Sequence, residues 1–191
     1  MRIISGKHRG TKLYTLDGLD TRPTLDRVKE PLFSIINFDI PDATVLDLFS
    51  GSGAIGLELI SRGAKRAILC DNSSKAIQII EKNVEKIKSD KQIDIIHNDY
   101  LKTLELLKRK NEKIDIVFLD PPYMTDFACV SCEKIAEYNL LNEHGIIIIE
   151  TDRKDVVVEK IKQKNLFEVY DERKYGRANL IFLKLKKNEH T

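Results

Sequence analysis

The strongest constraint on the fold is a repeated alternation of apolar runs and helical patterns from residue 43 onward. Two of the runs, residues 116–119 and 146–149, contain only Ile, Val, Phe and Leu. Such runs are typical of parallel strands that are buried on both faces. The pattern predicts five strands: Val45–Phe49, Ala67–Asp71, Ile93–His97, Ile114–Asp120 and Gly145–Thr151. Helices are expected between and after them, near 54–62, 74–88, 100–110, 126–138 and 153–164. This alternation predicts a doubly wound α/β sheet.

The C-terminal part of the chain departs from this rhythm. Two strand patterns, Phe167–Tyr175 and Asn179–Lys186, are joined at Gly176 with no helix between them. Adjacent strands with a short connection pair antiparallel, so we expect the sheet to end in an antiparallel pair.

The N-terminal part also differs from the α/β pattern. Apolar residues flank turn glycines at Gly6 and Gly10, which predicts a hairpin over residues 1–16. A helix is expected next, with Thr24 as its N-cap and Pro31 kinking or restarting it. We therefore expect an N-terminal unit, 1–40, and a catalytic domain, 41–188.

Composition narrows the class of protein further. The chain has 191 residues, 42% of them hydrophobic and 32% charged, which suits one globular domain with a short extension. No apolar run approaches membrane-spanning length and no signal peptide is evident, so a cytoplasmic location is expected. Cys70, Cys129 and Cys132 are too few for a disulfide framework. The single Cys-x-x-Cys has no further zinc ligands, so we expect reduced thiols on a helix and no metal.

A glycine-rich loop follows the first predicted strand. The segment from Gly51 through Gly53 to Gly56 matches G-x-G-x-x-G, and Asp71 lies twenty residues beyond Gly51 at the end of the second strand. Glycines allow a ligand to approach the backbone, and the acid can accept hydrogen bonds from ribose hydroxyls. The pattern predicts an adenosine cofactor, but it does not choose between NAD and S-adenosylmethionine.

Asp47, at the end of the first strand, favours S-adenosylmethionine. Its carboxylate would attract the positively charged methionyl end of that molecule, whereas it would repel a pyrophosphate. The expected cofactor residues are Asp47, Phe49, Gly51, Gly53 and Asp71.

Asp99 and Tyr100 follow the third predicted strand. Asp99 could accept a hydrogen bond from the cofactor's adenine amine, and the Tyr100 backbone could contact the ring. The alternative is that Asp99 is only a helix cap, since Asp is a favoured N-cap residue.

A second motif, Asp120-Pro121-Pro122-Tyr123, follows the fourth predicted strand. Because the prolines stiffen the backbone, Asp120 and the Pro121 carbonyl form a rigid pair of hydrogen-bond acceptors. Two acceptors can grip both hydrogens of a base amine and direct its lone pair at a methyl group, while Tyr123 stacks on the base. The motif indicates methyl transfer to an exocyclic amine, on a base flipped out of any duplex.

The first twelve residues carry Arg2, Lys7, Arg9 and Lys12 and no acid. A local basic segment can bind phosphates even though the net charge of the chain is only +2. We expect these cations to bind RNA; the alternative is an ordinary solvated surface, which we favour for the lysines of the C-terminal tail.

Four segments together resemble the RsmD family of bacterial 16S rRNA guanine-N2 methyltransferases. They are residues 2–13, Arg22-Pro-Thr-Leu-Asp-Arg-Val-Lys-Glu30, residues 47–53 and residues 120–123. The resemblance implies a class I, Rossmann-like methyltransferase fold with a seven-stranded sheet whose last strand is antiparallel. It implies S-adenosylmethionine as donor and guanine of small-subunit rRNA as acceptor. It also implies that the Arg22–Glu30 segment, which includes Thr24, packs near the cofactor and that the basic hairpin meets RNA. We expect Arg22 to bind RNA as well, and we expect a monomer acting on an assembling particle, with naked rRNA and another oligomeric state as open alternatives.

Three alternatives stay open. An NAD-dependent dehydrogenase would share the glycine loop but leave Asp120-Pro-Pro-Tyr123 unexplained. An RNA-binding protein without catalysis would not need Asp47, Asp71, Asp99 and Asp120 together. The same chemistry could also act on adenine in DNA or on a protein glutamine, although no added target-recognition domain is apparent.

Overall fold

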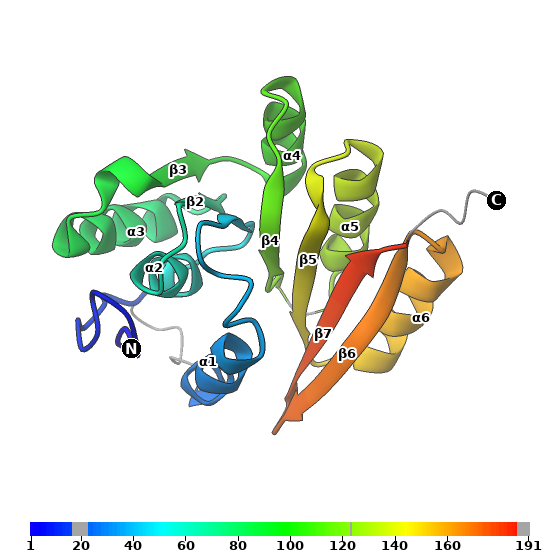
Figure 1. Ribbon diagram of the computed structural model, residues 1–191, viewed down its shortest axis with the longest axis horizontal. Coiled ribbons are helices and arrows are strands. Elements are labelled where there is room, and N and C mark those ends of the chain that lie inside the picture. The colour runs from blue at the N-terminus through cyan, green and yellow to red at the C-terminus, as the bar shows by residue number, and fades with distance from the viewer. Residues whose placement is uncertain (17–22, 123, 187–191) are drawn as a thin grey trace.

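The computed structural model describes residues 1–16, 23–122 and 124–186, without the side chains of residues 23–27. Its centre is a seven-stranded sheet with the order β3-β2-β1-β4-β5-β7-β6 (Figure 1). The strands are β1 Thr44–Asp47, β2 Arg66–Asp71, β3 Ile93–His97, β4 Ile114–Leu119, β5 Leu141–Thr151, β6 Phe167–Tyr175 and β7 Ala178–Leu185. The first five pair parallel, as their apolar runs predict.

The last two strands confirm the antiparallel ending. β7 pairs antiparallel with both β5 and β6, so the last strand runs against the rest of the sheet. Strand β5 begins at Leu141, four residues before the predicted start at Gly145, and a register shift on β4 accompanies this extension.

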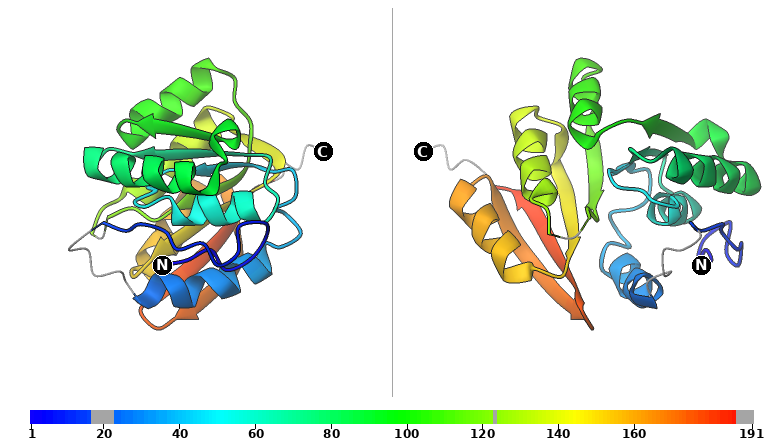
Figure 2. Two further views of the ribbon diagram at one scale, coloured as in Figure 1. Left: turned by 90° about the vertical axis from the view of Figure 1, so that its left-hand side faces the viewer. Right: turned by 180° about the vertical axis from the view of Figure 1, so that it is seen from behind.

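In the part of the chain that the structure describes, six α-helices cover the two faces of the sheet (Figures 1 and 2). They are α1 Pro23–Ile35, α2 Ala54–Ser61, α3 Ser74–Ile87, α4 Tyr100–Arg109, α5 Phe127–Glu137 and α6 Lys154–Lys164, with a 3-10 turn at Asp90–Gln92. Alternate strand residues belong to two hydrophobic clusters, one shared with α1, α2 and α3 and the other with α4, α5 and α6. None of the described helices is both long and apolar enough to cross a membrane.

Residues 1–16, here called the N-terminal arm, form the predicted hairpin in an irregular form. One antiparallel bridge joins Arg2 to Lys12, and the turn glycines Gly6 and Gly10 have φ of 82° and 86°. Ile3 and Leu13 are buried in the same cluster as α1, α2 and α3. The arm is therefore packed onto the sheet domain and is part of its core.

A buried ion pair anchors this arm. The Glu58 carboxylate of α2 accepts from the backbone N–H groups of Ile4 at 2.8 Å and Ser5 at 3.0 Å. Lys29 of α1 lies 3.3 Å from the same carboxylate, and both side chains are fully buried. A buried carboxylate is stable only with such partners, so the arm, α1 and α2 hold one another in place.

One prediction about α1 is wrong, and a second is wrong in one of its two forms. The helix begins at Pro23, a favoured first helical residue, so Thr24 lies inside the first turn and is not the N-cap. The helix also does not restart at Pro31, which lies within one continuous element. Val28, Leu32 and Phe33 are buried against the sheet, and this packing offsets the hydrogen bond that proline removes.

Candidate active site

Parallel strands bring four acidic side chains to one edge of the sheet. Asp47, Asp71 and Glu150 lie at or near the ends of β1, β2 and β5, and Asp120 directly follows β4. In an open α/β sheet the carboxyl edge is where ligands bind. Three of the four were predicted from the sequence, and Glu150 was not.

The glycine loop is held by the strand ends on either side of it. Gly51 and Gly53 have φ of 55° and 77°, which favour glycine. The Gly51 N–H donates to Asp71 Oδ2 at 2.8 Å, and the Ser73 N–H donates to Asp71 Oδ1 at 2.9 Å. Asp71 therefore fixes the loop, and each of its oxygens keeps a further lone pair for a ribose hydroxyl.

Asp47 is a strongly perturbed acid at this edge. It is 2% exposed, and its Oδ2 atom has no hydrogen-bond partner among the described residues. Burial is the largest cause that raises the pKa of Asp47, to about 8, and the Asp120 and Asp71 carboxylates add to it. A cationic ligand group would relieve this strain, as the methionyl ammonium of S-adenosylmethionine could.

The remaining geometry also fits that cofactor. A Cβ atom added at Gly51 would meet no atom within 4 Å, so the outer face of the loop is open to a ligand. The residues that would hold S-adenosylmethionine are Asp47 at the methionyl end, the Gly51 backbone, and Asp71 at the ribose.

Three aromatic rings form a cluster next to this loop. The Phe49 and Tyr100 centroids are 5.5 Å apart, and Tyr100 stacks on Phe127 with centroids 4.8 Å apart. All three side chains are only partly buried, so ring surface remains for a flat ligand such as adenine. Phe49 and Tyr100 were predicted as cofactor residues. Phe127 was missed, although its position at the start of the helix after Asp120-Pro-Pro-Tyr123 was a usable signal.

Asp99 is the N-cap that the alternative interpretation described. Its Oδ1 accepts from the Leu101 N–H at 2.9 Å at the start of α4. The cap uses Oδ1 only, so Asp99 keeps acceptor capacity for an adenine amine, and its contact with cofactor stays a prediction.

The described residues of the acceptor motif, Asp120, Pro121 and Pro122, directly follow β4. Asp120 is partly buried and Pro121 is buried. The Thr125 hydroxyl donates to the Pro122 carbonyl at 2.8 Å, and Met124 takes a left-handed φ of 64°. Tyr123 lies outside the described residues, so its predicted stacking role stays a prediction.

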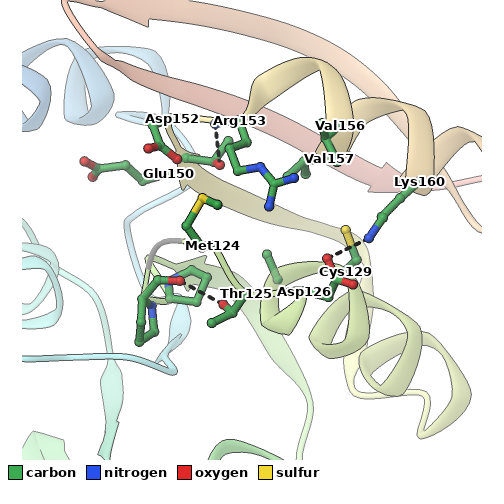
Figure 3. A pocket seen from close by; sticks show the side chains of 14 residues that line it. Met124, Thr125, Asp126, Cys129, Glu150, Asp152, Arg153, Val156, Val157 and Lys160 are labelled. Carbon is green, nitrogen blue, oxygen red and sulfur yellow. Dashed lines mark hydrogen bonds and ion pairs between the residues drawn. The ribbon is translucent and has the colours of Figure 1, made fainter.

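A pocket that is partly open to solvent lies beside these residues (Figure 3). Pro121, Pro122, Glu150, Arg153 and Lys160 are among the residues that line it. Lys160 is held at 2.6 Å by Asp126. Cys129 also lines the pocket, and it and Cys132 are buried free thiols on α5, the helix on which the sequence placed them.

One buried side chain that the sequence did not single out joins the arm to the glycine loop. Asn83 of α3 accepts from the Tyr14 N–H at 2.7 Å and donates to the Tyr14 and Ser52 carbonyls at 3.0 and 2.9 Å. It was missed because a helical Asn has no motif, and only the fold shows its partners.

Lys7, one of the predicted RNA-binding cations of the arm, is remote from the acceptor motif. Lys7 donates from Nζ to Gln92 Oε1 at 2.9 Å, directly before β3 begins. The arm tip therefore lies at the amino edge of the sheet, opposite the glycine loop. Arg22 and the Thr24 side chain lie outside the described part of the chain.

Comparisons with known proteins agree with this geometry. The model of the family described as conserved hypothetical protein 95 matches residues 1–184. The Bacillus subtilis protein YlbH is 37% identical over 153 residues, covering 80% of this chain and 83% of that protein. Ribosomal RNA small subunit methyltransferase D of Haemophilus influenzae is 35% identical over 156 residues, covering 80% and 79%.

A solved structure matches across nearly the whole molecule. The Escherichia coli protein yhhF superposes with a TM-score of 0.82 at 29% identity, covering 98% of this chain and 99% of that one. With the strand order above, this match identifies the fold as that of the class I methyltransferases.

Proposed function

The chain belongs to the conserved hypothetical protein 95 family, the RsmD family that its sequence resembles, and from that premise we propose that it methylates RNA. The acceptor is the exocyclic N2 amine of a guanine in 16S rRNA of the small ribosomal subunit. The methyl donor is S-adenosylmethionine, whose methyl group is bonded to a positively charged sulfonium sulfur. When the methyl group is transferred, the rest of the donor leaves as a neutral thioether.

The observation that carries the proposal is the position of the acceptor turn beside the cofactor loop. Asp120 is close enough to Asp47 for its charge to contribute to the raised pKa of Asp47. A base amine held at Asp120 therefore lies within reach of a methyl group held above the Asp47 loop. The Thr125 hydroxyl bonds the Pro122 carbonyl, and the two prolines restrict the backbone, so we expect little ordering to remain for the reaction itself.

The residues of the turn perform two tasks. Asp120 and the Pro121 carbonyl accept the two amine hydrogens, which orients the nitrogen lone pair toward the methyl carbon. As the N–C bond forms and the C–S bond breaks, positive charge develops on the nitrogen. The Asp120 carboxylate stabilises that charge and then accepts the proton the nitrogen loses.

The cofactor-side residues hold the donor in line. Asp47 attracts the methionyl ammonium, Asp71 accepts from ribose, and Phe49, Tyr100 and Phe127 offer aromatic surface to the adenine. Asp71 has the additional task of fixing the Gly51 backbone, so its loss also loosens the loop.

Asp120→Asn tests whether Asp120 acts on the acceptor base and not on the cofactor. We expect methyl transfer to small-subunit rRNA to fall by at least about 100-fold, the usual scale for removing a charge-stabilising group, with S-adenosylmethionine affinity unchanged. Single-turnover rates, calorimetry with the cofactor, and mass spectrometry of the rRNA nucleosides measure the three quantities.

Asp126→Asn is the matched control, because this nearby carboxylate contacts Lys160 and not the amine. It should retain wild-type turnover. Near-normal turnover in Asp120→Asn would refute the acceptor role. Methylated adenine or glutamine in place of guanine would overturn the substrate while leaving the cofactor site intact.

A further inference from the structure

Glu150 is a buried acid at the ligand edge that the reaction described above does not use. Its side chain is 3% exposed, and it sits one residue before the end of β5. Two other buried acids lie elsewhere in the described residues: Glu58 of α2 binds the arm, and Asp47 ends β1 beside the glycine loop.

Sheet register places Glu150 next to the acceptor turn. Leu119 of β4 pairs with Ile149 of β5, so Asp120 and Glu150 are the next residues on adjacent strands. Phe118 and Ile148 both belong to the cluster shared with α1, α2 and α3. Because side chains alternate along a strand, Asp120 and Glu150 point to that same side.

The close view agrees with this placement. Glu150 lines the pocket together with Pro121 and Pro122. Its carboxylate points away from Arg153 and Lys160, toward the end of the pocket that is remote from α6 (Figure 3). The side chain therefore lies on the acceptor side of the turn.

Guanine presents a donor at this position that adenine and 2-aminopurine lack. Its N1–H lies next to the N2 amine, whereas adenine and 2-aminopurine carry an unprotonated N1 with a lone pair. A flipped base is read through hydrogen bonds to this edge. A fixed carboxylate beside the amine would accept the guanine N1–H and would repel a bare N1.

We propose that Glu150 selects guanine by accepting its N1–H while Asp120 and the Pro121 carbonyl hold the N2 amine. The inference rests on the proposed function and adds the residue that sets base specificity. A site built around one donor discriminates strongly against analogues that lack it, because the buried acceptor then gains no bond from the base.

The test compares two RNAs that differ only at the target nucleotide, guanine or 2-aminopurine, at the site mapped by nucleoside mass spectrometry. Both carry the same amine. The wild type should favour guanine in kcat/KM by on the order of 100-fold or more. In Glu150→Gln, whose amide can donate to a bare N1, this preference should shrink on the order of 10- to 100-fold. 2-Aminopurine also lacks the O6 atom of guanine, but this difference affects the wild type and Glu150→Gln equally. Dividing the wild-type preference for guanine by that of the variant therefore isolates the contact at residue 150.

Asp152→Asn is the matched control, since this exposed carboxylate lies two residues away. It should keep the wild-type preference, and Glu150→Gln should keep wild-type S-adenosylmethionine affinity. An equal preference in Glu150→Gln and wild type would overturn the inference.

The wild type alone provides a second test if the variant does not fold. Efficient methylation of 2-aminopurine RNA by the wild type would show that no acceptor for N1–H operates. Methylation of neither RNA would instead count against the proposed function, so the two failures are distinguishable.

Discussion

Asp47 is held in a state that a solvated aspartate would not adopt. Its pKa is raised from 3.8 to about 8 by burial first and by Asp120 and Asp71 next. Near neutral pH the cofactor-free protein therefore keeps a proton on this group. The folded state binds that proton between about pH 4 and 8, whereas the unfolded chain has released it.

The sign of the resulting pH dependence follows directly. The folded pKa lies above the unfolded value, so the stability contribution is fully present below about pH 4 and is lost as pH rises toward 8. We expect Asp47→Asn, which cannot titrate, to gain stability relative to wild type as pH increases. The difference in the free energy of unfolding between Asp47→Asn and wild type should grow by at most about 1.4 kcal/mol per pH unit.

Urea unfolding of both cofactor-free proteins at pH 5, 6.5 and 8 measures this difference. Asp126→Asn serves as the control for a carboxylate whose pKa is shifted the other way, downward through Lys160. If the free energies of unfolding of Asp47→Asn and wild type changed with pH in the same way, the raised pKa of Asp47 would be contradicted.

At the scale of single residues, the sequence alone predicted most of the acidic side chains of the candidate site but not all of the residues that contact it. Asp47, Asp71, Asp99 and Asp120 were singled out because each lies near the end of a predicted strand or shortly after one. Glu150 and Asn83 were not, since neither lies in a motif. Their roles depend on register and on contacts between residues far apart in the chain, which spacing cannot supply.

At the scale of elements, the N-terminal arm shows how a short irregular segment is fixed. The Lys7 N–H donates to the Ser61 carbonyl at 2.9 Å, and the Ser61 hydroxyl donates to the Ser5 carbonyl at 2.6 Å. A Cβ atom at Gly6 would lie 1.8 Å from the Ser61 carbonyl oxygen. Gly6 is therefore required both by its φ and by this contact.

Gly10 provides a matched comparison. It has a similar φ of 86°, but an added Cβ would meet nothing within 4 Å. Gly10→Ala should cost only the left-handed backbone, roughly 1–2 kcal/mol. Gly6→Ala should cost at least about 2 kcal/mol more, because its clash is with backbone that cannot rotate away.

Denaturant unfolding gives the two free energies, and hydrogen exchange at the Ile4 and Ser5 amides reports whether the arm has detached from Glu58. Equal destabilisation by the two substitutions would show that the packing of Gly6 on α2 contributes nothing.

The elements themselves were largely predictable, because strand runs and helix periodicity are local signals. The errors occurred where tertiary packing overrides local preference. The buried face of α1 keeps that helix continuous through Pro31, and pairing with β4 extends β5 back to Leu141.

At the scale of the whole molecule, the tip of the basic arm at Lys7 and the acceptor motif lie at opposite edges of the sheet. Helix α3 connects the two edges with 14 residues, a length of about 21 Å at 1.5 Å per residue. The sequence predicted both features, but it could not predict their separation, which depends on how the arm docks on α2.

The proposed RNA role of the arm predicts a specific salt response. Replacing Lys7, Arg9 and Lys12 with Ala should weaken RNA binding and leave cofactor affinity intact. If each cation binds one phosphate, the slope of log affinity against log salt should become less steep by roughly 0.7 for each phosphate that is no longer bound.

Titrations at several salt concentrations measure that slope. Replacing Lys184 and Lys186, exposed cations elsewhere on the chain, provides the control. An unchanged RNA affinity and salt slope in the triple variant would show that the arm is an ordinary solvated surface and does not bind RNA.

The distance between the two edges has a consequence for the kind of RNA that can be a good substrate. A short loop containing the target guanine can occupy the acceptor side without reaching Lys7. Only an RNA that presents its target nucleotide and a second stretch of backbone at a fixed separation engages both. If the arm binds RNA as proposed, the enzyme would favour a target guanine in RNA that has already folded into the required tertiary structure.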